Sequence, residues 1–130
     1  MVAIGQMRFN ANQLDTMVKI HQNHCDFTSK KFRNNFELGE VKMKIQFLDC
    51  MKSKDSLLLA GKVIANSLEG IPCNIFIASI TDTNCLIEPI FAQTDNQGNF
   101  KIKIKRDNSK SIYFTSLSYL DLELRIKNLE

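Results

Sequence analysis

The sequence predicts a mainly β fold with an N-terminal helix-plus-strand extension. Residues 57–130 alternate apolar and polar side chains, with turn residues at intervals of roughly ten, which indicates a sandwich or barrel. Residues 12–37 instead repeat apolar side chains with a helical period. The chain has 130 residues and is 44% hydrophobic, so it can form a core, and disorder throughout is excluded.

The extension, residues 1–56, is predicted to hold a helix over about 12–37 and a strand over about 41–48. Asn12 is the expected N-cap and Gly39 the expected C-cap. The helix face comprises Leu14, Met17, Val18, His21, Cys25, Thr28, Phe32 and Phe36. The strand is predicted to bury Val41, Met43, Ile45 and Phe47. The polar stretch 52–56 is the expected boundary.

The second segment, residues 57–130, reads as strands separated by turns, and no helix is predicted in it. Pro89 marks one of these strands as an edge or a bulge. The turn at 95–99 contains Gly98, which supplies the positive φ that such turns need. The expected strands are 57–65, 73–80, 86–93, 100–105, 112–116 and 120–126.

Charge and hydropathy exclude two classes of function. The net charge of +3 is too small to argue for nucleic-acid binding. No apolar run approaches the roughly 20 residues of a membrane span, so membrane insertion is not expected.

The start, residues 1–12, lacks the pattern of a secretory signal. The whole charge of +3 falls in residues 1–56, because residues 57–130 carry eight basic and eight acidic side chains.

Several motifs in the second segment resemble the carboxypeptidase regulatory-like domain. Gly61-Lys62-Val63, then Gly70-Ile71-Pro72, then Asn74-Ile75-Phe76-Ile77 is similar to the family's opening pattern. Thr94-Asp95-Asn96-Gln97-Gly98-Asn99-Phe100 resembles its T-D-x-x-G-x-F signature. Residues 112–119 resemble the strand that leads into a Gly-Tyr pair, with Ser118 in place of the usual Gly before Tyr119.

The resemblance covers residues 57–130 and implies a transthyretin-like (prealbumin-like) Greek-key β-sandwich of about seven strands. The family is an accessory module without catalytic residues. It occurs beside metallocarboxypeptidase domains, at the N-terminus of TonB-dependent receptors and in bacterial surface proteins. The resemblance therefore implies a periplasmic or cell-surface location, whereas the start of the chain lacks a signal. Fold-level similarity does not by itself assign a function.

One group of residues has the side chains of a metal-binding or catalytic site. His21 and Cys25 are four residues apart and would share a helix face, with His24 beside them. A structural zinc site needs about four ligands, and Cys50 offers a third, but no fourth is obvious. The alternative is that His21 and Cys25 line the apolar helix face. The four cysteines, Cys25, Cys50, Cys73 and Cys85, show no C-x-x-C pair and are expected to be free thiols.

These observations favour a non-enzymatic interaction or structural protein with no cofactor. We expect it to bind a protein partner, or a second copy, through the N-terminal extension or the sheet edges. Two alternatives remain open. The first is a phage or secretion-machine subunit assembled from the cytoplasm. The second is a small metal-binding protein or enzyme that uses His21, His24 and Cys25.

Overall fold

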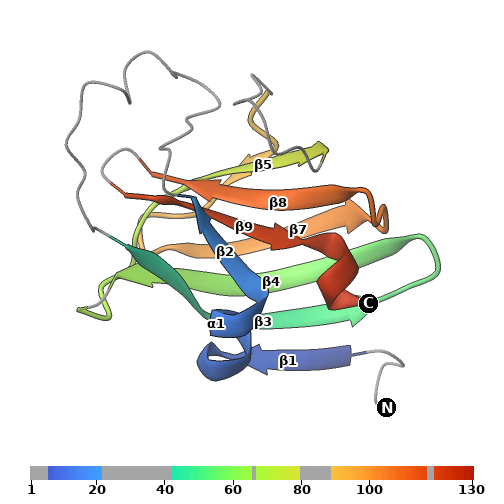
Figure 1. The fold of residues 1–130 in the computed structure, drawn as a ribbon, viewed down its shortest axis with the longest axis horizontal. Helices are drawn as coiled ribbons and strands as arrows, with labels where there is room; N and C mark the ends of the chain where they lie inside the picture. Colours follow the sequence, from blue (N-terminus) through green and yellow to red (C-terminus); the bar gives the residue numbers. More distant parts are fainter. Residues whose placement is uncertain (1–5, 22–41, 66, 80–88, 117–118) are drawn as a thin grey trace.

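The protein is a β-sandwich of two antiparallel sheets with one short α-helix (Figure 1). The computed structural model describes residues 6–21, 42–65, 67–79, 89–116 and 119–130. The elements are β1 (Gln6–Asn10), α1 (Ala11–Met17), β2 (Val18–His21), β3 (Met43–Lys52), β4 (Ser56–Ala65), β5 (Asn74–Ser79), β6 (Ala92–Gln93), β7 (Asn99–Lys105), β8 (Lys110–Thr115), β9 (Asp121–Arg125) and the 3₁₀ helix η1 (Ile126–Leu129).

Strands from both predicted segments are combined in both sheets. The four-stranded sheet has the order β1-β3-β4-β7, and the five-stranded sheet has the order β2-β9-β8-β5-β6. Residues 52–56, the expected boundary, include the turn of the β3–β4 hairpin. The mainly β sandwich is therefore confirmed. The described part of the second segment holds six strands, β4 to β9, where about seven were expected, and the described part of the first segment adds β1, β2 and β3.

The predicted helix over 12–37 is wrong at residues 18–21. α1 ends at Met17, and the chain continues as β2, which pairs with β9. The N-cap is Asn10, not Asn12: Asn10 and Gln13 form a capping box. Residues 18–21 are VKIH, in which two β-branched residues alternate with polar ones. Pairing with a distant strand therefore overrides a weak helical pattern. Residues 22–37 lie outside the described residues.

The predicted strand at 41–48 is present, begins at Met43 and runs on to Lys52. A shift in register between Ile45 and Phe47 marks a β-bulge. Met43, Ile45 and Leu48 face the core, whereas Phe47 lies half-buried on the outer side. The prediction that Phe47 faces inward was therefore wrong, because the extra residue at the bulge reverses the alternation. Val41 lies outside the described residues.

In the second segment, β4, β5, β7, β8 and β9 occupy the predicted strands. The strand expected at 86–93 is reduced to Ala92–Gln93 among its described residues, and Pro89 precedes it outside any strand. The chain ends in η1, although no helix was predicted there. Within the described ranges, no helix has the length and hydropathy of a membrane span.

The core lies between the sheets. In it the aromatic rings of Phe100 and Phe114 pack together, with their centroids 5.2 Å apart. Gly61 is required beneath Phe100, because a Cβ atom there would lie 2.9 Å from the ring and 2.5 Å from the Phe47 carbonyl oxygen. The absence of a side chain at Gly61 thus lets β3, β4 and β7 pack closely.

Candidate functional site

The predicted metal or catalytic cluster is only partly described. His21 is the last residue of β2 and pairs in register with Asp121 of β9. His24 and Cys25 lie outside the described residues. In the part of the chain that the structure describes, no group of three or more His, Cys, Asp or Glu residues could hold a metal ion. Cys50, the third ligand considered, faces the core from β3.

The two described cysteines, Cys50 and Cys73, are free and buried. The Cys73 Sγ lies 3.5 Å from the Met43 Sδ and 3.4 Å from the Ile71 carbonyl oxygen. Burial, with the nearby charge of Asp121, raises the pKa of Cys73 to about 12. Burial also raises the pKa of Cys50. Both thiols are therefore held protonated, unlike the thiolate of a reactive cysteine.

The turn that resembles the T-D-x-x-G-x-F signature is held by hydrogen bonds from backbone N–H groups to side-chain oxygens. The Asp95 carboxylate accepts from the backbone N–H groups of Gln97 and Asn99, at 2.8 and 2.9 Å. These bonds, chiefly the one from Asn99, lower the pKa of Asp95. Thr94 Oγ1 accepts from the Cys73 N–H at 2.8 Å, and Gly98 adopts a φ of 80°. The residues of this signature therefore shape a turn and attach it to the start of β5.

The outer side of the five-stranded sheet carries a buried polar cluster, which we define as Ser111, Tyr113, Thr115, Asp121 and Glu123. All five residues are no more than 5% exposed. The Ser111 hydroxyl donates a 2.6 Å hydrogen bond to Glu123 Oε2. Burial, followed by the charge of Glu123, raises the pKa of Tyr113 to about 12. The cluster was missed in the sequence, because acids that alternate with leucines look like a solvated strand face.

The outer side of the four-stranded sheet gathers positive charge from three strands, β1, β4 and β7. Two rows cross this sheet in register. Arg8, Asp49, Ala60 and Lys101 form the first row, and Gln6, Met51, Leu58 and Lys103 form the second. Lys62 lies between Phe47 and Asn99, and Lys105 lies opposite Ser56. We call this surface the basic face and define it by Arg8, Lys62, Lys101, Lys103 and Lys105.

Apolar side chains lie at the centre of the basic face. Met51 is 39% exposed, and Phe47 and Leu58 are half-buried. The lysines of β7 border these side chains on one side and are exposed. A partly exposed apolar centre with a charged rim is the composition of a protein-binding surface.

Arg8 anchors the other border of the basic face. Its guanidinium donates to both carboxylate oxygens of Asp49, at 2.6 and 2.9 Å, and lies 4.7 Å from the centre of the Phe47 ring. The same hydrogen bond lowers the pKa of Asp49. Because Asp49 is the acidic residue in the rows defined above and is already bound to Arg8, the lysines dominate the charge of the face.

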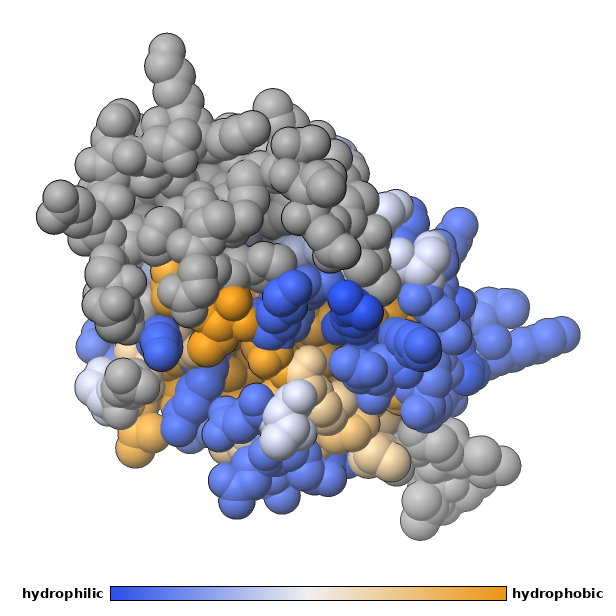
Figure 2. All heavy atoms as spheres, viewed as in Figure 1, coloured by the Kyte–Doolittle hydropathy of each residue, from blue (hydrophilic) through white to orange (hydrophobic). Residues whose placement is uncertain are grey.

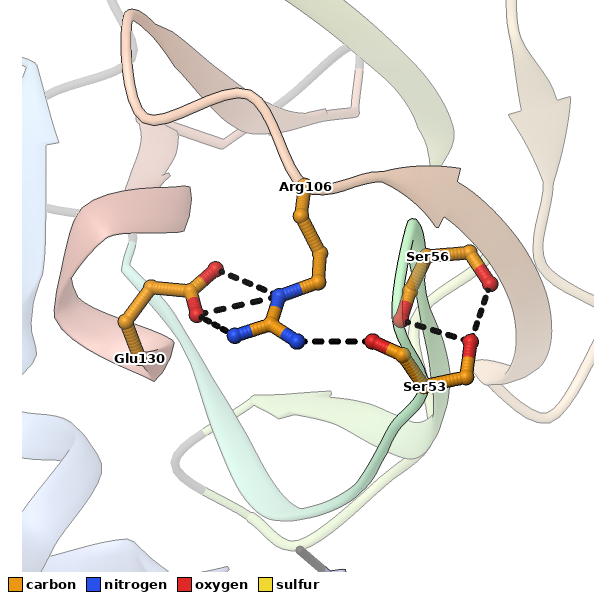
Figure 3. Close-up of polar contacts among 4 residues, drawn as sticks. All are labelled: Ser53, Ser56, Arg106 and Glu130. Carbon is orange, nitrogen blue, oxygen red and sulfur yellow. Dashed lines mark hydrogen bonds and ion pairs between the residues drawn. The ribbon is translucent and has the colours of Figure 1, made fainter.

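Arg106 connects one end of the four-stranded sheet with Glu130 and the β3–β4 turn (Figure 3). Arg106 donates from Nε to Glu130 at 3.1 and 3.3 Å and from Nη1 to the Ser53 carbonyl oxygen at 2.6 Å. This contact joins the β3–β4 turn, the end of β7 and the residue after η1. An open cleft beside it is lined by Lys54, Asp55, Lys105, Arg106, Asp107 and Asn108. Charges of both signs alternate there, so the cleft has less charge preference than the basic face.

α1 connects β1 and β2, which are edge strands of the two different sheets, and some apolar surface is exposed beside it. Figure 2 shows this hydrophobic surface near the middle of the view, with hydrophilic side chains over the end that holds the C-terminus. A cavity of about 50 Å³ is lined there by Leu14, Val18, Ile20, Met43, Ile45 and Leu122, among others. This volume is far below the roughly 300–1,000 Å³ of small-molecule sites. The basic face is therefore the stronger candidate.

Comparisons of the chain with protein-family models, curated proteins and solved structures found no match.

Proposed function

We propose that this chain is a non-enzymatic protein-interaction module, an accessory domain or structural subunit of a cell-envelope or surface assembly. The observation that carries the proposal is the basic face, where partly exposed Met51, Leu58 and Phe47 lie among five cationic side chains. The resemblance of residues 57–130 to carboxypeptidase regulatory-like domains also favours an accessory role.

The rigidity of the surface supports binding rather than chemistry. Its side chains stand on paired strands, so a partner would meet a surface already in its bound shape. The exposed lysines provide long-range attraction and partner selection, and the apolar centre provides burial. The described thiols have raised pKa values, which is unfavourable for nucleophilic catalysis.

The proposal is tested by the native mass of the assembly and by a pair of charge-matched variants. The variant K101E/K103E reverses two charges of the basic face. The control K19E/K127E makes the same net change at exposed lysines of β2 and η1. We expect the parent and the control to co-purify with a protein partner and the basic-face variant to lose it. A monodisperse monomer for the parent, or equal recovery of the partner with both variants, would reject the proposal.

A further inference from the structure

The edge strand β7 differs from the other edges of the two sheets. Among the described residues, β7 pairs only with β4, and its seven residues keep an unbroken register from Asn99 to Lys105. The other edge strands have five residues in β1, four in β2 and two in β6. Within the part of the chain that the structure describes, β7 is thus the longest edge strand. At the ends of β7 the Asn99 backbone is bonded to Asp95 and the Lys105 carbonyl oxygen accepts from Asp107. Between these ends, the outer edge presents the backbone N–H and C=O groups of Lys101 and Lys103 to a further strand.

The side chains of β7 divide cleanly between its two sides. Phe100, Ile102 and Ile104 face the core and are 4–6% exposed. Lys101, Lys103 and Lys105 are exposed on the other side. A strand added at this edge must follow the same alternation, because opposed residues share one side of a sheet.

This alternation disfavours a second copy of the same strand. In any antiparallel self-pairing that keeps the lysines out of the core, Lys103 or a neighbouring lysine meets another lysine across the strands. Like charges placed directly opposite each other are destabilising. A shift by one residue would avoid the repulsion only by turning one copy's lysines toward the core.

An added strand that carries acidic side chains would attract the lysines of β7 instead of repelling them. If apolar residues alternate with Asp or Glu, each carboxylate lies opposite a lysine while the apolar residues extend the core side. Lys62, on the neighbouring strand β4, adds positive charge on the same face of the sheet. We infer that β7 accepts an extended acidic segment of a partner protein by strand addition. This inference rests on the proposed function and specifies the chemistry of the partner.

The test uses the full chain and three labelled peptides, followed by fluorescence anisotropy. The first peptide is Glu-Val-Glu-Val-Glu-Val-Glu, which has the length of β7 and places Glu opposite Lys101, Lys103 and Lys105 when the two strands overlap fully. The second has Lys in place of Glu. The third is the first peptide with every backbone amide N-methylated, so that it keeps the charge but cannot donate to a strand.

We expect the glutamate peptide to bind, and to bind at least about tenfold more weakly in high salt. The lysine and N-methylated peptides should bind at least about tenfold more weakly than the glutamate peptide. K101E/K103E should lose the glutamate peptide, and K19E/K127E should retain it.

Equal binding of the N-methylated peptide would overturn strand addition, because charge alone would then explain the affinity. Binding to phosphatidylserine vesicles without binding to the glutamate peptide would overturn it in favour of a lipid surface. If K101E/K103E loses its native partner but the parent binds no peptide, strand addition fails and the proposed function stands. If the parent is a monomer without a co-purifying partner and yet binds the peptide, the assembly role in the proposed function fails and the strand-accepting edge stands.

Discussion

The hydroxyl of Ser111 donates a 2.6 Å hydrogen bond to the carboxylate of Glu123, and both side chains are buried on the outer side of the five-stranded sheet. A buried carboxylate is tolerated only with such partners, because its desolvation must be offset by hydrogen bonds.

Removing the Ser111 hydroxyl should destabilise the fold. We expect S111A to lower the free energy of unfolding by about 1–3 kcal/mol, since a buried acceptor loses its donor. Urea denaturation would measure the change. The control S79A, at the exposed end of β5, should stay within about 0.5 kcal/mol of the parent. Equal effects of the two substitutions would contradict a stabilising role for the Ser111–Glu123 bond.

Tyr113 should titrate at about 12, above the ordinary tyrosine value of 10.0, because burial and the charge of Glu123 disfavour its phenolate. Because the pKa of Tyr113 is higher in the folded state than in the unfolded chain, the contribution of the protonated Tyr113 to the free energy of unfolding is complete below pH 10. It is lost as the pH rises toward 12. Tyrosinate absorbance would follow the titration, with Y113F identifying the signal. A midpoint near 10 for the signal that Y113F removes would contradict this prediction.

The ion pair between Arg106 and Glu130 should make the fold less stable at low pH than at neutral pH. The hydrogen bond from Arg106 lowers the pKa of Glu130, so its contribution is present at neutral pH and lost as the pH falls through the lowered value. We expect E130Q to be less stable than the parent at neutral pH and equal to it at low pH. Thermal melting across pH would measure both, with exposed Glu69 giving the control E69Q. A difference that persists unchanged in acid would show that the charge is not the cause.

Gly98 should not tolerate a side chain. Its φ is 80°, and a Cβ atom would lie 2.2 Å from the carbonyl oxygen of Val63. We expect G98A to lower the free energy of unfolding by about 1–3 kcal/mol through backbone strain and steric overlap. The control Q97A changes an exposed neighbour in the same turn and should be near neutral. Denaturant unfolding of both variants would decide, and a G98A variant as stable as Q97A would contradict the prediction.

The strands of the second segment were predictable because their alternation is local. Lys101, Lys103 and Lys105 identify the outward side of β7 from the sequence alone. The end of the helix at Met17 was not predictable in this way, because it depends on the pairing of β2 with β9, about 100 residues away in sequence. The orientation of Phe47 likewise depends on a bulge that only the register with β4 reveals.

The candidate site was predictable only in part. The lysine row of β7 is visible in the sequence, but its proximity to Met51 and Arg8 follows from the order of the strands. The division of charge between two chain segments gave no indication of this, since Arg8 comes from the first segment and the β7 lysines come from the second. For Asp121 and Glu123, alternation separates the two sides of β9 but does not indicate that the polar side is buried.

The pairing of β2 with β9 has a consequence for synthesis. β2 is synthesised about 100 residues before its partner β9, because Val18 pairs with Leu124. The five-stranded sheet therefore cannot be completed until β9 has been made, and its folding includes the slow closure of a very long loop. Until β9 emerges from the ribosome, β2 lacks its partner strand, and an unpaired strand is prone to aggregation.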